Sequence, residues 1–276
     1  MESYEWKWKS RDGLEMYAHG WKPEKPKAVV ALIHGHGEHI NRYQHVAEAF
    51  TRAGYAIQAF DLRGHGQSAG SRGHTTDYDT LMNDISDFIV DSKNRYPGLP
   101  VFLYGHSMGG NQVINYVLRT PQGLKGVIAT GPWLKLAFAP PAAQLLMAKL
   151  LNNIVPSFSL ASGLSQEALS RDPEVVRKYA NDPLVHDKIS VRLYTSMYGN
   201  GLWALEHAAE LKIPMLLMHG SADKLTSAEA SREFAKIAGK LVTLRIWEGF
   251  YHEIHNEPEK VEVIQTMIDW LDKYSL

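Results

Sequence analysis

One serine lies between two glycines in the segment Gly105-His-Ser-Met-Gly109. The segment follows the apolar run 101–104 and precedes a helical pattern that ends before Pro121. A serine hydroxyl is an effective nucleophile only when the backbone exposes it and a base removes its proton. A strand that turns sharply into a helix provides this exposure, and the flanking glycines leave room for the turn. The sequence therefore predicts Ser107 as a catalytic nucleophile.

Two residues further along the chain could complete the chemistry. Asp223 follows the apolar run 215–219, and His252 follows the apolar run 241–247. Parallel strands bring their carboxyl ends to one edge of a sheet, and serine, acid and histidine occur in this chain order in the hydrolases that use such an elbow. We expect Asp223 to orient His252, and His252 to accept the proton of Ser107.

Each of these two assignments has a competitor. His255 could replace His252, but His252 directly follows the segment 249–251 whereas His255 adjoins the final helix. Asp61 also ends a predicted strand, although it precedes the serine in the chain. The pattern Asp61-x-Arg-Gly-x-Gly favours a structural turn held by an interaction between Asp61 and Arg63.

The oxyanion of a tetrahedral intermediate needs backbone N–H donors. We expect one donor from Met108, at the start of the helix after the serine, where the helix dipole also favours negative charge. The second should come from the glycine-rich loop after the apolar run 29–33, and we assign it to the amide of His36.

The same loop allows a different interpretation. Its residues His34, His36, Glu38 and His39 resemble the ligand spacing of a dinuclear metallohydrolase. That class would not need the serine elbow, and Glu38 replaces the usual Asp. We therefore expect no metal, and the metallohydrolase remains a distant alternative.

The elements that must position these residues alternate along the chain. Asp12-Gly13 between two alternating segments predicts a hairpin, and Thr226-x-x-Glu229 predicts a capping box at a helix start. Strands are expected at residues 4–9, 14–21, 29–33, 56–60, 101–104, 126–130, 215–219 and 241–247. Helices are expected at residues 43–53, 78–96, 108–119, 228–238 and 258–274, the last with Pro258 in its first turn. This order predicts an α/β protein with a mostly parallel eight-stranded sheet flanked by helices.

One segment interrupts the alternation. Residues 133–203 lack it, and we expect them to form a helical cap inserted between two parts of one core, residues 1–132 and 204–276. The first part of the insertion is rich in Leu, Ala, Met and Phe, so it could wall an acyl-chain tunnel. It supports at most transient contact with a membrane surface.

The composition excludes several classes. The 276 residues include 29 Lys or Arg and 30 Asp or Glu, for a net charge of −1, so no nucleic-acid partner is expected. There is no cysteine, which excludes disulfides and thiolate metal sites. No apolar segment reads as a signal peptide or a membrane span, so a cytoplasmic location is expected. The oligomeric state stays open.

Taken together, these segments resemble the α/β-hydrolase fold and, within it, the monoacylglycerol lipase and lysophospholipase-like serine hydrolases. The resemblance spans the whole predicted core and is carried by residues 34–39, 41–43, 61–66, 105–110, 219–223 and 251–255. It implies that Ser107, Asp223 and His252 form a triad that needs no metal or organic cofactor. It also implies a fatty acyl ester as the small-molecule substrate, first of all a monoacylglycerol. A lysophospholipid or a short- to medium-chain carboxylic ester is the alternative, and peptidases, thioesterases and lactonases use the same triad.

The resemblance extends to the alcohol side of the pocket. Residues 179–183 are similar to a cap segment of that family. The resemblance implies that a glycerol-like alcohol is bound by Arg42, His106, Tyr179 and His255. His36 stands where the family often has a small residue, which leaves the role of its backbone amide intact.

Overall fold

An eight-stranded sheet forms the centre of the computed structural model, which describes residues 1–121 and 123–275. The strand order is β1-β2-β4-β3-β5-β6-β9-β10; the pairs β1–β2 and β2–β4 are antiparallel and the other pairs are parallel. The predicted α/β-hydrolase architecture is therefore confirmed. The strands are β1 (Glu2–Lys9), β2 (Glu15–Lys22), β3 (Ala28–Ile33), β4 (Tyr55–Phe60), β5 (Val101–His106), β6 (Gly126–Thr130), β9 (Met215–Gly220) and β10 (Val242–Trp247).

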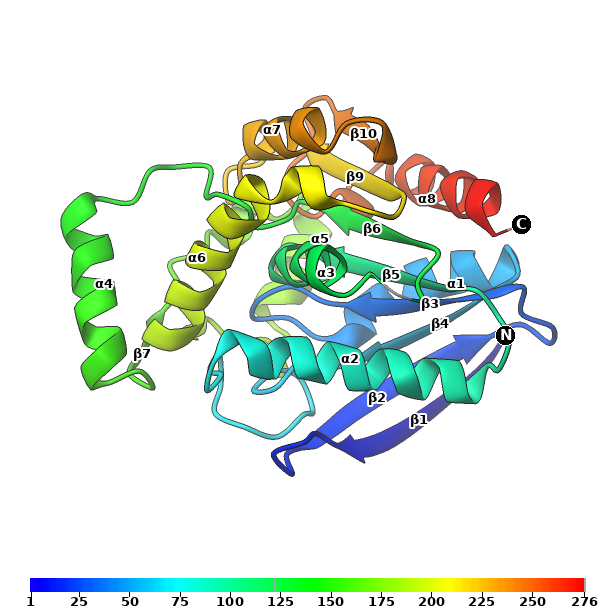
Figure 1. Ribbon diagram of the computed structural model, residues 1–276, viewed down its shortest axis with the longest axis horizontal. Coiled ribbons are helices and arrows are strands. Elements are labelled where there is room, and N and C mark those ends of the chain that lie inside the picture. Colours follow the sequence, from blue (N-terminus) through cyan, green and yellow to red (C-terminus); the bar gives the residue numbers. More distant parts are fainter. Residues whose placement is uncertain (122, 276) are drawn as a thin grey trace.

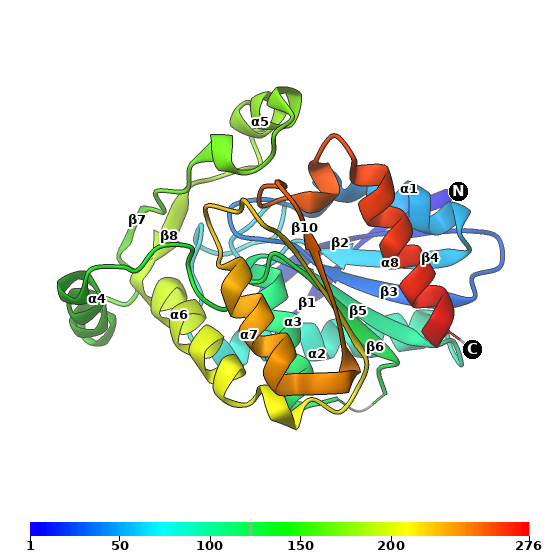
Figure 2. The same ribbon diagram turned by 90° about the horizontal axis from the view of Figure 1, so that it is seen from above.

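Helices cover both faces of this sheet (Figure 2). Helices α2, α3 and α7 pack on one face, and α1 and α8 pack on the other. The core helices are α1 (Gln44–Arg52), α2 (Tyr78–Arg95), α3 (Met108–Arg119), α7 (Ala228–Ala238) and α8 (Lys260–Tyr274).

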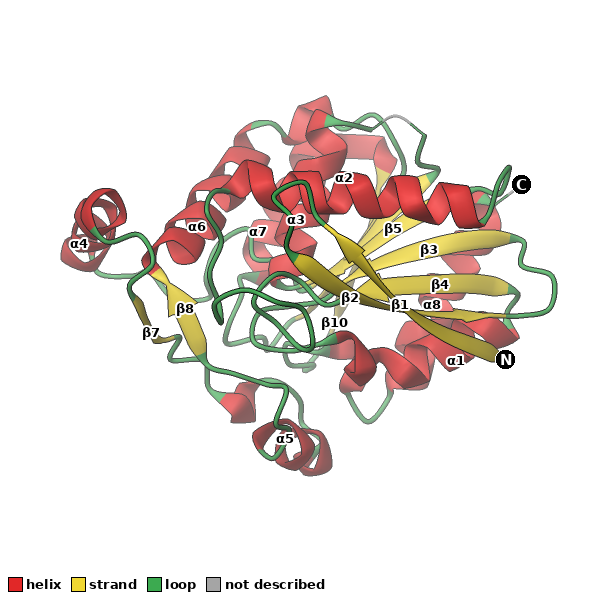
Figure 3. Ribbon diagram, turned by 90° about the horizontal axis from the view of Figure 1, so that it is seen from below, coloured by secondary structure: helices red, strands yellow, loops and turns green. Residues whose placement is uncertain are grey.

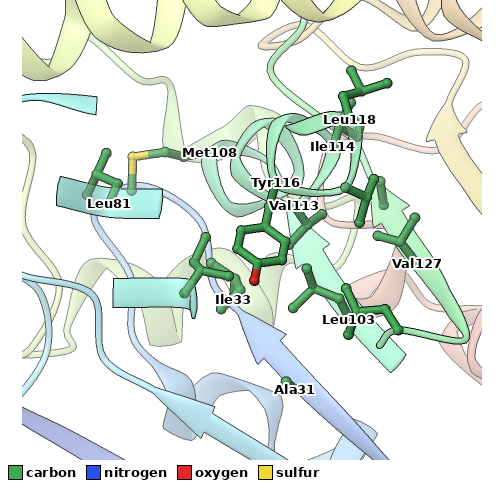
Figure 4. Packing of buried hydrophobic residues seen from close by; sticks show 14 of the residues in the cluster. Ala31, Ile33, Leu81, Leu103, Met108, Val113, Ile114, Tyr116, Leu118 and Val127 are labelled. Atoms are coloured by element: carbon green, nitrogen blue, oxygen red, sulfur yellow. The ribbon is translucent and has the colours of Figure 1, made fainter. Parts of the chain in front are cut away.

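The alternation of side chains along the parallel strands supplies the two halves of the core. In β3, Ala31 and Ile33 face the α2–α3 side, whereas Val30 and Leu32 face the α1–α8 side. Every residue of β3 is fully buried, as expected for a central parallel strand. Figure 4 shows Ile33 in one of these clusters, packed beside α3.

Between β6 and β9 the chain forms three α-helices and a short ribbon. These elements are α4 (Ala142–Ile154), β7 (Ser159–Ala161), α5 (Pro173–Ala180), β8 (Lys188–Ser190) and α6 (Val191–Glu206). The strands β7 and β8 pair antiparallel between α4 and α5, outside the main sheet (Figure 3). Helix α4 projects farthest from the core (Figure 1), and none of its residues is buried.

Several predicted boundaries differ from the structure. The ribbon β7–β8 was not expected, and the predicted cap boundary at residue 203 falls inside α6. Two Asn side chains of α3 bind backbone carbonyls of α6: Asn111 donates to Met197 and Asn115 donates to Asn200, both at 3.1 Å. Helix α6 is therefore hydrogen-bonded to α3 of the core near its middle. Helix α8 begins at Lys260, so Pro258 precedes its first turn.

No helix among residues 1–121 and 123–275 is long and apolar enough to cross a membrane.

Candidate active site

The backbone at Ser107 has a strained conformation. Its φ of 55° and ψ of −114° make it the one non-glycine residue with positive φ in the described part of the chain. Such a conformation costs about 1–3 kcal/mol and persists because the surrounding structure holds it. Here β5 ends, Ser107 caps α3, and the Ser107 N–H donates to the Thr130 carbonyl at 2.9 Å. The elbow predicted from the sequence is thus formed.

The glycines of the elbow are required by space. A Cβ on Gly105 would collide with the carbonyl of Gly109, and a Cβ on Gly109 would collide with the carbonyl of Ile33. The second contact means that the start of α3 lies directly against the end of β3. The turn can therefore be this tight only with glycine on both sides of Ser107.

Ser107, His252 and Asp223 form one hydrogen-bonded chain. The Ser107 hydroxyl lies 2.8 Å from Nε2 of His252, and Nδ1 of His252 lies 2.7 Å from Oδ2 of Asp223. The three residues come from loops after β5, β10 and β9, so the carboxyl edge of the sheet brings them together as the strand order requires. In contrast, His255 lies behind His106 and makes no contact with the serine hydroxyl.

The charges in this chain stabilise one another. Burial alone would raise the pKa of Asp223, but the facing His252 imidazole and the hydrogen bonds from His219 and His252 hold it well below its ordinary value. Burial alone would lower the pKa of His252, but the charge of Asp223 and its hydrogen bond raise it above 6.5. An ionised aspartate thus faces an imidazole with increased basicity.

The two residues predicted to donate backbone amides to the oxyanion, Met108 and His36, both lie near Ser107. Met108 is the first residue of α3, where no helical carbonyl is available to its N–H, and the helix dipole adds positive potential there. His36 lies in the loop after β3 and borders the same cavity as Ser107. Its ring is buried among those of His65 and His186, at centroid distances of 5.5 and 5.6 Å.

Three of the four loop residues weighed as metal ligands, His34, Glu38 and His39, bind other groups, whereas the ring nitrogens of His36 have no hydrogen-bond partner among the described residues. His34 contacts the carbonyl of Gly35 through Nδ1 and accepts the Leu62 N–H on Nε2. Glu38 binds the Arg42 side chain and the Gly35 amide, and His39 binds Asp182. Among the described residues, no three His, Asp or Glu side chains are grouped to hold a metal ion.

Asp61 holds a turn, but the predicted Asp61–Arg63 interaction is wrong. Its carboxylate accepts the backbone N–H groups of Ile40 and Gln67 at 2.9 and 2.7 Å. Arg63 instead pairs with Asp84 at 2.7 Å and with Asp12 at 3.0 Å. The two backbone donors offset only part of the effect of burial, which raises the pKa of Asp61 to about 6.

A small polar hollow lies on one side of Ser107. Its volume is about 10 Å³, room for about one water molecule. Two of the four predicted alcohol-binding residues line it, His106 and Tyr179. The rest of its wall is formed by Gly35, His36, Glu38, Leu164, Leu169, His252 and Glu253.

The other two predicted alcohol-binding residues, Arg42 and His255, lie one layer further back. Arg42 binds both oxygens of Glu253 at 2.7 Å and Glu38 at 2.7 Å, and its guanidinium lies 4.7 Å from the Tyr179 ring centroid. His255 is fully buried and stacks on Tyr43. Neither borders the hollow, because the two carboxylates and His106 stand in front of them.

A larger apolar cavity, about 150 Å³, opens on the other side of Ser107. Most of its wall comes from the insertion. Its apolar lining consists of Trp133, Leu136, Phe138, Pro140, Leu164, Ile189, Tyr194 and Leu225. Ser107 and His252 therefore lie between an apolar cavity and a polar hollow.

Two contacts of Asp223 were not predicted. Nε2 of His219 lies 3.0 Å from Oδ2, and the Thr226 hydroxyl lies 2.9 Å from the same oxygen. His219 lies in β9 and Asp223 in the turn after it, so their spacing in the sequence did not indicate this contact. Thr226 is also not the helix cap that the capping-box pattern predicted; Ser227 caps α7 instead.

The sheet order, the elbow after β5 and the histidine after the last strand define the protein as an α/β-hydrolase. Within that class, the family model described as serine aminopeptidase, S33, matches residues 24–259, and the chain belongs to this family. The monoacylglycerol lipase of Mycolicibacterium smegmatis is 35% identical over 94% of this chain and 93% of its own length. The phospholipase YtpA of Bacillus subtilis is 36% identical over 92% of this chain and 98% of its own length.

A solved structure is similar to this chain as well. The crystal structure of the Paleococcus ferrophilus monoacylglycerol lipase superposes with a TM-score of 0.85 and is 37% identical over 99% of this chain and all of that one. The chain spans only 27% of another relative, an uncharacterized abhydrolase domain-containing protein of Dictyostelium discoideum.

Proposed function

We propose that this protein is a serine hydrolase that cleaves monoacylglycerols into a fatty acid and glycerol. The observation that carries the proposal is the Ser107–His252–Asp223 chain, located between an apolar cavity and a polar hollow. A fatty acyl ester of a small alcohol is likewise apolar on the acyl side of its carbonyl carbon and polar on the alcohol side. The similar monoacylglycerol lipases support the same substrate class.

The first half of the reaction transfers the acyl group to the enzyme. Nε2 of His252 takes the hydroxyl proton while Oγ of Ser107 attacks the ester carbonyl, and Asp223 stabilises the imidazolium. The amides of His36 and Met108 donate to the oxyanion. When the tetrahedral intermediate collapses, His252 returns this proton to the alcohol oxygen, and glycerol leaves.

The second half uses water as the nucleophile. His252 takes a proton from a water that attacks the acyl-Ser107 carbonyl, and the same two amides stabilise the second oxyanion. The bond to Oγ then breaks, and the proton returns from His252 to Ser107. The fatty acid leaves through the apolar cavity, which would stabilise its chain by about 0.8 kcal/mol for each buried CH₂ group.

Charge around the hollow favours a neutral alcohol over a phosphorylated one. Its acidic wall residues are Glu38 and Glu253, and the nearby cation Arg42 is bound to both carboxylates. Carboxylates accept hydrogen bonds from hydroxyl groups but repel a phosphate. We therefore assign His106 and Tyr179 to the alcohol subsite and give Arg42 and His255 the role of supporting its walls.

The insertion, residues 133–203, is proposed to act as a cap over Ser107. It supplies most of the apolar wall, and Leu164 and Tyr179 restrict the hollow to the size of one water, so binding of a whole glycerol requires these cap residues to move. The exposed apolar side chains of α4 form a continuous patch next to this cavity. The patch consists of Leu146, Met147, Leu150 and Ile154, each more than half exposed. We propose transient membrane contact through it.

A matched pair of substrates tests the proposal. We expect kcat/KM for 1-oleoylglycerol to exceed that for its 3-phosphate by at least about tenfold, because the acidic hollow disfavours the phosphate. The Ser107→Ala variant should hydrolyse neither substrate. Equal or better hydrolysis of the phosphate would contradict the head-group assignment, and full activity in Ser107→Ala would contradict the proposed nucleophile.

A peptide p-nitroanilide and p-nitrophenyl esters extend the panel. We expect the esters to be cleaved and the anilide to be left intact, because the acyl side of Ser107 is an apolar cavity, which suits an acyl chain but would leave the polar backbone of a peptide without hydrogen-bond partners. Preferential cleavage of the anilide would indicate a peptidase instead.

A further inference from the structure

A second histidine binds the carboxylate of Asp223. His219, the fifth residue of β9, places Nε2 3.0 Å from Oδ2 of Asp223, and that oxygen also lies 2.7 Å from Nδ1 of His252. The other nitrogen of His219, Nδ1, lies 2.8 Å from the hydroxyl of Ser231 on α7. The side chains of His219 and Asp223 and the whole of Ser231 are fully buried.

The partners of His219 fix its protonated nitrogen. Nε2 faces Oδ2 of Asp223 at 3.0 Å and the carbonyl oxygen of Thr226 at 3.2 Å, and both are acceptors. Nε2 therefore carries a hydrogen. Nδ1 lies 2.8 Å from the Ser231 hydroxyl, and this contact holds the ring so that its Nε2–H is directed at the carboxylate.

The arrangement mirrors the proposed catalytic chain around one carboxylate. On one side, Ser107 binds Nε2 of His252, whose Nδ1 binds Oδ2. On the other side, Ser231 binds Nδ1 of His219, whose Nε2 binds the same oxygen. Since Ser231 is fully buried, it is not a second nucleophile.

We propose that His219, oriented by Ser231, is a positioning residue that holds the Asp223 carboxylate in the orientation and charge distribution that His252 requires. The inference rests on the proposed function, in which His252 is the base. Its physical basis is competition, because two N–H groups share the negative charge of one oxygen. The N–H of His219 withdraws part of that charge from the bond to His252.

Because His219 and His252 bind the same oxygen, removal of His219 should shift the pKa of His252 in one definite direction. Without the His219 donor, more negative charge faces the imidazolium of His252, so the pKa of His252 rises. The other titratable groups around His252 are His106, at a ring-centroid distance of 4.8 Å, and the more distant His255, Glu38 and Glu253. On the α7 side, His219 meets the uncharged hydroxyl of Ser231. None of these groups is changed by a substitution at His219.

The test compares His219→Leu with His219→Gln. We expect His219→Leu to lower kcat about tenfold with little change in KM. The acidic limb of its pH profile of kcat/KM should move to higher pH by about half a unit. His219→Gln should restore most of the wild-type kcat and pH profile, because its amide N–H reaches toward the same oxygen and its amide oxygen can accept from Ser231. A far-downfield proton resonance of the His252–Asp223 hydrogen bond should shift in His219→Leu and return in His219→Gln.

Two further variants control for folding. Ser231→Ala removes only the hydroxyl that orients His219, and we expect a smaller shift of the acidic limb in the same direction. His74→Leu removes another histidine–serine contact, the 2.9 Å bond to Ser190, which is not bonded to Asp223, and should leave the limb in place. If the His219→Leu variant does not fold, the pH–rate profile of Ser231→Ala tests the inference instead: a shifted acidic limb supports it, and an unchanged limb overturns it.

The outcomes separate this inference from the proposed function. An unchanged acidic limb in folded His219→Leu and Ser231→Ala, together with an inactive Ser107→Ala variant, would overturn the role of His219 alone. Full activity in Ser107→Ala would overturn the proposed function instead.

Discussion

At the scale of single residues, proton transfer depends on the two atoms 2.8 Å apart, Oγ of Ser107 and Nε2 of His252. The charge of Asp223 raises the pKa of His252 above 6.5 despite burial. A protonated imidazole cannot accept the serine proton, so the raised pKa moves the loss of activity to higher pH than for a free histidine.

We therefore predict that kcat/KM falls about tenfold per pH unit once the pH drops below a midpoint above 6.5. The measurement is a pH–rate profile from pH 5 to 9 with a p-nitrophenyl ester. A profile that stays flat down to pH 5 would exclude His252 as the base.

Catalytic residues that follow apolar runs could be predicted from the sequence. The hydrogen-bond partners of individual loop side chains could not. Ser107, His252 and Asp223 were found because each follows an apolar run that ends at the same sheet edge. The bonds of Asp61 to backbone amides and of His219 to Asp223 depend on side-chain directions within loops. No spacing rule in the sequence specifies those directions.

At the scale of elements, the elbow requires the start of α3 to contact β3 and β5. A methyl group on Gly105 would collide with the carbonyl of Gly109 and approach the side chain of Val113, and both belong to α3. The helix would have to move away from the strand, and Ser107 would move with it.

We predict that Gly105→Ala lowers the free energy of unfolding by about 1–3 kcal/mol and removes most of the activity. Gly199→Ala is the control, because Gly199 lies within α6 and nothing lies within 4 Å of its added methyl group. The control should raise the free energy of unfolding by about 0.5–1 kcal/mol. Urea denaturation and an ester assay measure both variants; equal stability of the two would contradict the packing argument.

The core elements were predictable because burial leaves a clear pattern. Central strands such as β3 are continuously apolar, and they alternate with amphipathic helices. The ribbon β7–β8 was missed because its strands are three residues long, too short to show a period. The capping box was misplaced by one residue because Thr226 binds Asp223 and leaves Ser227 to cap α7.

At the scale of the whole molecule, α4 stands out because none of its residues is buried. It projects from the insertion, and Leu146, Leu150 and Ile154 follow one another at intervals of four residues on one face. Their exposed fractions are 60%, 52% and 74%. An apolar face next to the substrate cavity could bring the enzyme to its lipid substrate.

We predict that the double variant Leu150→Glu and Ile154→Glu loses binding to phosphatidylcholine vesicles and hydrolyses monoacylglycerol in vesicles more slowly. Its activity on a short-chain p-nitrophenyl ester should stay within about twofold, since neither residue lines the cavity. Val261→Glu is the control, because Val261 is also 74% exposed but lies on α8. Equal vesicle binding by the wild-type protein, the double variant and Val261→Glu would refute the proposed membrane contact.

The whole account depends on Ser107 as the nucleophile, and covalent labelling tests this most directly. A fluorophosphonate reacts with a serine that has an activated hydroxyl and an oxyanion site, so mass mapping of the peptide adduct identifies the residue. We predict one adduct per chain, on Ser107, with loss of esterase activity in proportion to labelling and no adduct in Ser107→Ala. An adduct on another residue, or full activity after complete labelling of Ser107, would contradict the account.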